Sequence, residues 1–352
     1  MDIKIPFFEE YKDAIRCRVC PHNCIIDEGK FGICGVRTVK DNLPVAVNYG
    51  EVTSMGVDPI EKKPLYHFKP SKNILSIGSF GCNMTCSFCQ NYEISQGRPQ
   101  TQYMSVEKLL DILPSIENNA GVAFTYNEPF MWYEYIYDAA KSTKENKQSE
   151  SVVVVTNGYI NEEPLLNLLP YVDAMNIDLK GYTNRYYNKV CGAKLEPVLE
   201  SIKRCNEYCH VEITTLLVSE ENDSLDEARE IAQFIASINE NIPLHLSRYF
   251  PRYKIENAAT KIERITEAQN EAKKYLKYVY VGNVDGVDNN TYCPKCNALL
   301  IRRNGYETEV VMKGNKCEKC NELLIKRNGY NTQVLIKENK CKKCGEEINI
   351  HL

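Results

Sequence analysis

Seven short runs of apolar and β-branched residues recur along the middle of the chain. Polar or turn-forming residues bound each run, which is typical of buried β-strands. The runs occupy residues 73–77, 121–126, 151–156, 174–179, 211–218, 244–249 and 278–281.

Most of the gaps between these strands carry apolar residues at helical spacing. Val106, Leu109 and Leu110 fall on one helix face, and residues 228–235 repeat the pattern. Alternating strands and helices predict βαβ units and a parallel sheet. Six or seven such units fit a partial or full barrel better than a flat doubly wound sheet, but their spacing alone does not decide between the two.

Polar side chains lie on or directly after successive strands. In parallel barrels the reactive face is at the carboxyl ends of the strands, so we expect one shared site there. The polar groups are Thr125–Pro129, Thr156–Tyr159, Asp178–Lys180, Glu212, Thr214, Thr215, His245, Ser247 and Arg248.

Composition and charge argue against nucleic acid, membranes and export. The chain has 352 residues, of which 26% are charged, and a net charge of −4, so we expect no nucleic-acid partner. No apolar run approaches the ~20 residues that cross a bilayer, and the N-terminus does not read as a signal peptide. Most of the 16 cysteines fall in tight groups, which favours metal binding over disulfides and a reducing, cytoplasmic location.

Three cysteines follow the first predicted strand as C-x3-C-x2-C. They are Cys82, Cys86 and Cys89. A [4Fe-4S] cluster normally takes four cysteines, so three leave one iron open for chemistry. Zinc sites more often use C-x2-C pairs, and we therefore favour a cluster.

This motif, with Phe88 before its last cysteine, resembles the signature of radical SAM enzymes. The stretches 81–83 and 88–95 are similar to the radical SAM protein of the AmmeMemoRadiSam group. That group is related to the glycyl-radical-enzyme (pyruvate formate-lyase) activating enzymes, and the similarity covers nearly the whole chain. The resemblance implies an open (β/α)6 barrel, a [4Fe-4S] cluster, S-adenosylmethionine (SAM) and an electron donor of flavodoxin or ferredoxin type.

In that family, one electron from the cluster cleaves SAM to methionine and a 5'-deoxyadenosyl radical. The resemblance implies that this radical abstracts hydrogen from a glycine of a partner protein or from another large substrate. The alternative is a metal-binding adaptor that binds RNA or a partner protein and catalyses no reaction.

The resemblance also assigns cofactor-binding roles. Glu128 would face the SAM amine, although Tyr-Asn-Glu-Pro stands where the family keeps a Gly-Gly-Glu-like stretch. Asn157 would lie near the SAM ribose or carboxylate. Asp178 would help hold a monovalent cation or the methionine end. Lys180 would offset the SAM carboxylate or meet the substrate; a surface salt bridge between these two is the alternative.

Two further cofactor contacts are expected on the last strands. Thr214 and Thr215 face opposite sides of their strand, so only one of them would contact SAM. His245 would lie near the adenine, or else serve as a structural core histidine. We expect Cys205 and Cys209 to lie on a helix face and to pack as small hydrophobic side chains.

Two cysteine-rich parts flank the predicted core of residues 71–288. Residues 1–70 form an N-terminal module in which four cysteines fall within eighteen residues, a pattern that fits zinc or a second iron–sulfur cluster. Those cysteines are Cys17, Cys20, Cys24 and Cys34.

Residues 289–352 form a tail built from a repeat. Residues 293–316 and 317–340 are two copies of 24 residues, identical at 16 positions, and a third copy begins at Cys341. C-x2-C pairs around a short hairpin segment predict a zinc ribbon. A four-ligand site uses the middle pair of cysteines with either the first pair or the last pair, and the sequence does not decide which. The three pairs are Cys293 with Cys296, Cys317 with Cys320, and Cys341 with Cys344.

Overall fold

A curved eight-stranded sheet forms the centre of the molecule. The computed structural model describes residues 7–146, 150–294, 296–310, 326–328, 331–333 and 351. Seven sheet strands are parallel and the edge strand β7 is antiparallel. In order across the sheet they are β15 (Val279–Gly282), β14 (Leu244–Arg248), β13 (His210–Leu217), β12 (Ala174–Asp178), β11 (Ser151–Thr156), β10 (Asn119–Phe124), β8 (Asn73–Gly78) and β7 (Ser54–Pro59).

The predicted α/β fold with a mostly parallel sheet is confirmed. Each of the seven apolar runs is a strand of this sheet. The strand β7 was not predicted, because Ser54–Pro59 has no continuous apolar run and includes Gly56 and Pro59. Since β15 and β7 are the two edges, hydrogen bonds between strands do not close the sheet into a ring.

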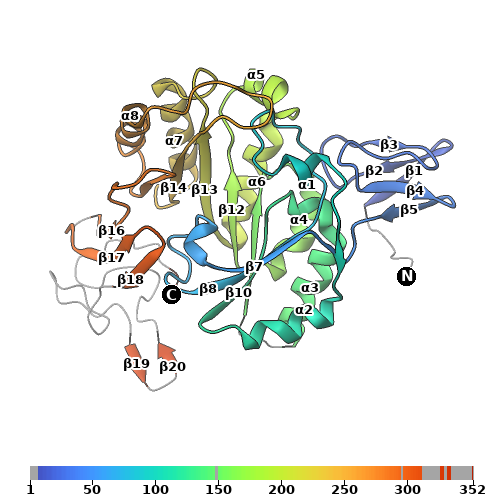
Figure 1. Ribbon diagram of the computed structural model, residues 1–352, viewed down its shortest axis with the longest axis horizontal. Coiled ribbons are helices and arrows are strands. Elements are labelled where there is room, and N and C mark those ends of the chain that lie inside the picture. The colour runs from blue at the N-terminus through green and yellow to red at the C-terminus, as the bar shows by residue number, and fades with distance from the viewer. Residues whose placement is uncertain are drawn as a thin grey trace.

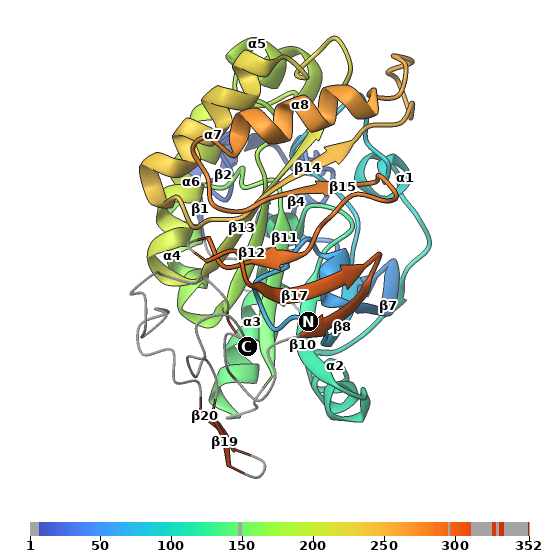
Figure 2. The same ribbon diagram turned by 90° about the vertical axis from the view of Figure 1, so that its left-hand side faces the viewer.

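Helices connect the parallel strands, and the longer ones run along the outside of the sheet (Figures 1 and 2). Residues predicted to share a helix face, such as Ile231 and Ile235 of α7, are buried. Ser105 and Ser224 cap α2 and α7, because each side chain accepts the N–H of the residue three positions on. The helices are α1 (Tyr92–Gln96), α2 (Val106–Ile112), α3 (Tyr133–Glu145), α4 (Glu162–Leu168), α5 (Asn184–Tyr186), α6 (Leu195–Tyr208), α7 (Leu225–Asn239) and α8 (Ile262–Ala272).

The N-terminal residues form small sheets beside the main one (Figure 1). Arg37 anchors them, because its guanidinium makes two hydrogen bonds of 2.7 and 2.8 Å to the carboxylate of Glu134 on α3. Both side chains are buried. The strands are β1 (Phe8–Tyr11), β2 (Ala14–Cys17), β3 (Ile25–Ile26), β4 (Arg37–Lys40), β5 (Leu43–Ala46), and β6 (Glu51–Val52), which pairs with β9 (Gln102–Tyr103).

The described part of the tail contains two antiparallel units. Arg303 joins the first unit to the core, since its Nη2 donates to the carbonyl of Tyr66 at 2.6 Å. The units are β16 (Thr291–Tyr292) with β17 (Leu299–Asn304) and β18 (Glu307–Val310), and β19 (Lys326–Asn328) with β20 (Asn331–Gln333).

Glu212 ties the amino ends of the strands to the segment before β8. Its buried carboxylate accepts the backbone N–H groups of Tyr66 and His67, at 3.0 and 2.7 Å. It also accepts hydrogen bonds from Nε2 of His210 and Nε2 of His245, at 3.0 and 2.7 Å. Burial disfavours the charge, but these bonds outweigh it and hold the pKa of Glu212 well below its usual range. No helix among the described residues is long and apolar enough to span a membrane.

Candidate functional site

A cavity of about 390 Å³ opens at the carboxyl ends of the parallel strands. This is the end at which parallel barrels place their reactive groups. The predicted cysteine triplet and most of the predicted cofactor-binding residues line it. Its walls include Cys82, Cys86, Phe88, Cys89, Tyr126, Asn127, Glu128, Thr156, Asn157, Asp178, Lys180, Thr214, Ser247 and Asn283.

Backbone hydrogen bonds hold the loop that carries the triplet on two sides. Thr85 N–H donates to the carbonyl of Cys191, and Ser87 N–H donates to the carbonyl of Val190. On another side, Lys254 N–H donates to the carbonyl of Ser87 at 2.9 Å. The loop that follows β14 therefore reaches the loop that follows β8, and the stacked rings of Tyr92 and Tyr253, 4.4 Å apart, join them further.

The thiol of Cys82 has nearby N–H donors that suit a ligand of an iron–sulfur cluster. Met84 N–H lies 3.4 Å and Asn157 Nδ2 3.8 Å from the sulfur of Cys82, and such donors stabilise cluster-bound thiolates. In the described part of the chain, no three His, Cys, Asp or Glu side chains meet closely enough for one metal ion. A cubane binds each cysteine at a different iron, so its thiols surround a volume and need not meet at one point.

Glu128 is buried and fixed by three donors. Its Oε1 accepts Phe130 N–H at 3.0 Å and the Thr156 hydroxyl at 2.6 Å, and its Oε2 accepts Asn157 N–H at 2.8 Å. Burial outweighs these bonds and raises the pKa of Glu128 to about 7. The preceding Tyr126 has φ of 75°, a left-handed conformation that turns the chain sharply into the cavity wall.

Asn157, Asp178 and Lys180 stand on the neighbouring strand ends. Asn157 Nδ2 donates to Oδ1 of Asn83 at 2.9 Å, so it braces the residue next to Cys82. Lys180 Nζ lies 2.9 Å from Asp178 Oδ2. This ion pair faces the cavity, because both residues are among its walls.

The remaining predicted cofactor contacts divide between the cavity and the core. Thr214 lines the cavity, whereas the Thr215 hydroxyl turns away and donates to the carbonyl of Leu179. Phe88 also lines the cavity. His245 lies near the amino end of β14, is buried against Glu212 and is not among the cavity walls, so its contact with adenine stays a prediction.

Sequence reasoning missed the asparagines that brace the site. Asn127 Nδ2 donates to the carbonyl of Gly81 at 2.9 Å, and its Oδ1 accepts Ser79 N–H at 3.1 Å. Asn83 Nδ2 donates to the carbonyl of Tyr159 at 2.6 Å. Asn127 and Asn83 stand inside the stretches already singled out, but no pattern in the sequence pairs them with their distant carbonyls.

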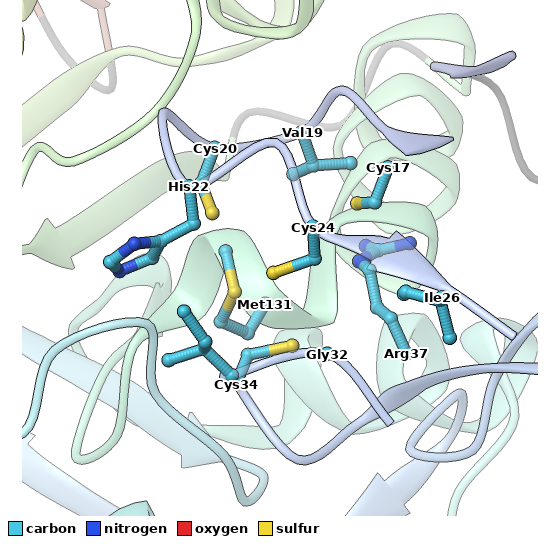
Figure 3. Close-up of a pocket in the computed structure, with 11 residues that line it drawn as sticks. Cys17, Val19, Cys20, His22, Cys24, Ile26, Gly32, Cys34, Arg37 and Met131 are labelled. Carbon is cyan, nitrogen blue, oxygen red and sulfur yellow. The ribbon is translucent and has the colours of Figure 1, made fainter. Parts of the chain in front are cut away.

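The predicted metal-binding cysteines outside the cavity fall into two groups. Cys17, Cys20, Cys24 and Cys34 surround a small separate pocket in the N-terminal module (Figure 3). Cys293 is buried and Cys296 partly buried in the tail. The other predicted tail ligands lie outside the described residues: Cys317, Cys320, Cys341 and Cys344.

Three cysteines that line a cavity at the carboxyl ends of parallel strands are typical of enzymes that bind an iron–sulfur cluster. Comparison with known proteins agrees, because residues 76–235 match the Radical SAM superfamily. An uncharacterized protein of Methanocaldococcus jannaschii is 43% identical over 315 residues, which are 87% of this chain and 92% of that one. The chain thus belongs to the radical SAM superfamily, whose members use a [4Fe-4S] cluster and SAM.

More distant relatives carry named activities. The pyruvate formate-lyase-activating enzyme of Clostridium pasteurianum is 25% identical over 56% of this chain and 85% of its own. A probable dual-specificity RNA methyltransferase RlmN of Natranaerobius thermophilus is 24% identical over 63% of this chain and 67% of its own. This chain is therefore a radical SAM enzyme related to the activating enzymes.

Proposed function

We propose that this protein is an activating-type radical SAM enzyme that abstracts a hydrogen atom from a protein substrate. One observation carries the proposal: Cys82, Cys86 and Cys89, which would leave one iron of a cluster without a protein ligand, line the same cavity as Glu128, Asn157 and Lys180. When bound there, a [4Fe-4S] cluster and SAM supply a 5'-deoxyadenosyl radical.

The chain itself binds and orients SAM beside the cluster. The carboxylate of Glu128 is suited to the ammonium group of SAM. The positive charge of Lys180 is suited to the SAM carboxylate, while Asp178 holds Lys180 in place. Thr214 adds a hydroxyl on the same wall. The remaining task of the cavity is to exclude water from a reactive radical, since the radical chemistry belongs to the cofactors.

The similarity to activating enzymes supports a glycine of a partner protein as the hydrogen donor. An electron donor of flavodoxin or ferredoxin type would reduce the cluster. The zinc that we infer for the tail would be bound by four of its six cysteines, with either the pair Cys293 and Cys296 or the pair Cys341 and Cys344 left over. The core of residues 71–288 would then stand between two metal-binding parts in a cytoplasmic protein.

The test is SAM cleavage by anaerobically reconstituted protein. With dithionite and SAM, we expect 5'-deoxyadenosine from the wild-type protein and none from Cys89→Ser. Cys205→Ser is the matched control, because this thiol is buried on α6 and contacts Met175 away from the cavity. If the cluster-loaded wild-type protein yields no 5'-deoxyadenosine, the proposed enzymatic function is refuted and the metal-binding adaptor is favoured.

An RNA substrate is the second candidate, because the segment that follows the cavity-lining Ser247 combines aromatic and basic side chains. Phe250 is 44% exposed, and the guanidinium of Arg248 lies 4.8 Å from its ring centre. Arg252 and Lys254 are exposed beside Tyr253. Such a combination suits stacking on unpaired bases.

Deuterium transfer separates the two candidates. Cells are grown in deuterated medium, and their extract is divided into a protein fraction and an RNA fraction. Each fraction is then incubated with the protein, SAM and dithionite. Deuterium in 5'-deoxyadenosine from the protein fraction alone supports the protein substrate. Deuterium from the RNA fraction alone replaces that proposal with the RNA substrate.

A further inference from the structure

Four thiols line a small pocket inside the N-terminal module (Figure 3). Cys17 ends β2, Cys20 and Cys24 lie in the segment between β2 and β3, and Cys34 comes from the following loop. Three of these thiols are buried and Cys24 is partly buried. Four soft ligands from three stretches of chain therefore face one enclosed space, away from the SAM cavity.

Arg37 supplies a second and independent observation. This residue also lines the pocket, and it is only 1% exposed. Its two terminal nitrogens bind Glu134, but its Nε is buried without a hydrogen-bond partner in the part of the chain that the structure describes. A buried donor without an acceptor is costly, and a metal-bound thiolate is an acceptor that would satisfy it.

The segment between Cys20 and Cys24 touches the loop of the SAM cluster. His22 Nε2 lies 2.7 Å from the carbonyl oxygen of Asn83, so this nitrogen carries the proton and donates. Asn83 is the neighbour of Cys82. On the other side, Asn161 Nδ2 donates to the carbonyl of Cys20 at 3.2 Å. A ligand that holds Cys20 and Cys24 in place would therefore also hold His22, which supports the loop of Cys82.

We propose that Cys17, Cys20, Cys24 and Cys34 bind a second metal centre, to which Arg37 Nε donates a hydrogen bond. This centre holds the His22 segment against the cluster loop. A zinc ion and an iron–sulfur cluster share the required thiolate chemistry. The thiols as placed are not a ready-made site for one ion, so zinc would draw them inward, whereas a cluster would occupy the space among them.

The existence of this centre does not depend on the proposed radical chemistry. Metal content is measured without any assay of activity, so each proposal can fail alone. Binding by four thiols also requires no oxidant or reductant, because each thiol loses only a proton when it becomes a ligand.

The first experiment compares the metal content of three full-length proteins purified anaerobically. Relative to wild type, Cys20→Ser/Cys34→Ser should lose about one zinc, or about four irons with matching sulfide. Any zinc bound by the tail contributes equally to all three proteins, because none of the substitutions lies in the tail, and it does not affect the difference in metal content. Cys205→Ser, with its thiol packed against Met175, should keep the wild-type content. Unchanged zinc, iron and sulfide in the double variant would overturn the proposal.

A second experiment uses the wild-type protein and so avoids any loss of folding. Cys24 is partly exposed, whereas burial raises the pKa of the Cys209 thiol to about 12 and this thiol donates to the carbonyl of Cys205. If Cys24 is a ligand, alkylation followed by peptide mapping should modify it slowly in the untreated protein. Chelators for zinc and for iron should then make Cys24 react at least about tenfold faster and leave Cys209 unchanged. Equal reaction of Cys24 with and without chelators would overturn the proposal.

Discussion

Among single residues, Glu128 is held in one orientation by the chain itself. Both of its oxygens accept hydrogen bonds, from Phe130, Thr156 and Asn157. A carboxylate that is already oriented can meet an ammonium group without further reorganisation. Because burial raises its pKa to about 7, its charge changes within the pH range in which enzymes are assayed.

The first prediction concerns the pH dependence of SAM binding. Below pH about 7 Glu128 takes up a proton and loses its attraction for the SAM amine. We expect the affinity for SAM to rise by up to about tenfold per pH unit from pH 6 to 7 and to level off above pH 8. Equilibrium dialysis of the cluster-loaded protein measures this.

Glu128→Gln is the control for that prediction. The amide keeps the shape of the side chain but carries no charge, so SAM should bind more weakly and with a flatter pH profile. The raised pKa also means that Glu128 favours folding below its unfolded value of 4.5 and loses that contribution as pH rises through about 7. A wild-type affinity that does not vary from pH 6 to 8 would contradict the role of this carboxylate.

At the scale of elements, a short wide helical turn supports the cluster loop. The turn spans Tyr187–Cys191 and ends at Gly192, whose φ of 69° is left-handed. Thr85 N–H and Ser87 N–H bind the carbonyls of this turn. A Cβ on Gly192 would overlap Oγ1 of Thr85, so glycine is required both by conformation and by this close approach.

Gly192→Ala should therefore disturb the cluster loop. We expect a loss of roughly 2–4 kcal/mol in stability, from left-handed strain and displacement of Thr85, and a lower iron content per chain. Gly286→Ala is the matched control, because its φ is 74° and nothing lies within 4 Å of its added Cβ. That variant should lose about 1 kcal/mol and keep its iron. Equal iron content in both variants would contradict the supporting role of the turn.

At the scale of the whole molecule, apolar packing, hydrogen bonds and a buried ion pair join the N-terminal module to the core. The ion pair is the bidentate one of Arg37 and Glu134, with side chains 1% and 4% exposed. Removing one partner of a buried pair leaves an uncompensated charge, which typically costs about 3–5 kcal/mol. The ion pair is therefore a substantial part of the attachment, beside the buried apolar side chains that the module shares with the core.

We expect Glu134→Ala to release the N-terminal module. Unfolding should become easier by about 3–5 kcal/mol, and residues 7–46 should gain hydrogen exchange before the core does. Glu145→Ala on the same helix is the control, since its contact with Lys141 is exposed and 3.8 Å long. That change should cost less than about 0.5 kcal/mol. Uniform exchange across module and core in Glu134→Ala would show that other contacts dominate.

The sequence predicts those features that depend on local pattern. Apolar runs gave the seven parallel strands, and the cysteine spacing located the cluster loop at the end of β8. The sequence could not predict pairs such as Arg37 with Glu134, because residues 97 positions apart leave no local pattern. The hydrogen bond between His245 and Glu212 likewise joins residues 33 positions apart, so the sequence could not decide whether His245 is a structural histidine or lies near adenine.

The contact between the β8 and β14 loops has a consequence for how large a molecule the enzyme admits. One hydrogen bond, from Lys254 to Ser87, and one stacked pair, Tyr92 with Tyr253, join the two sides of the rim. Together they are worth about 1–3 kcal/mol. Neither contact belongs to the strand pairing of the main sheet, so the two loops could separate and widen the entrance while every strand pair stays intact.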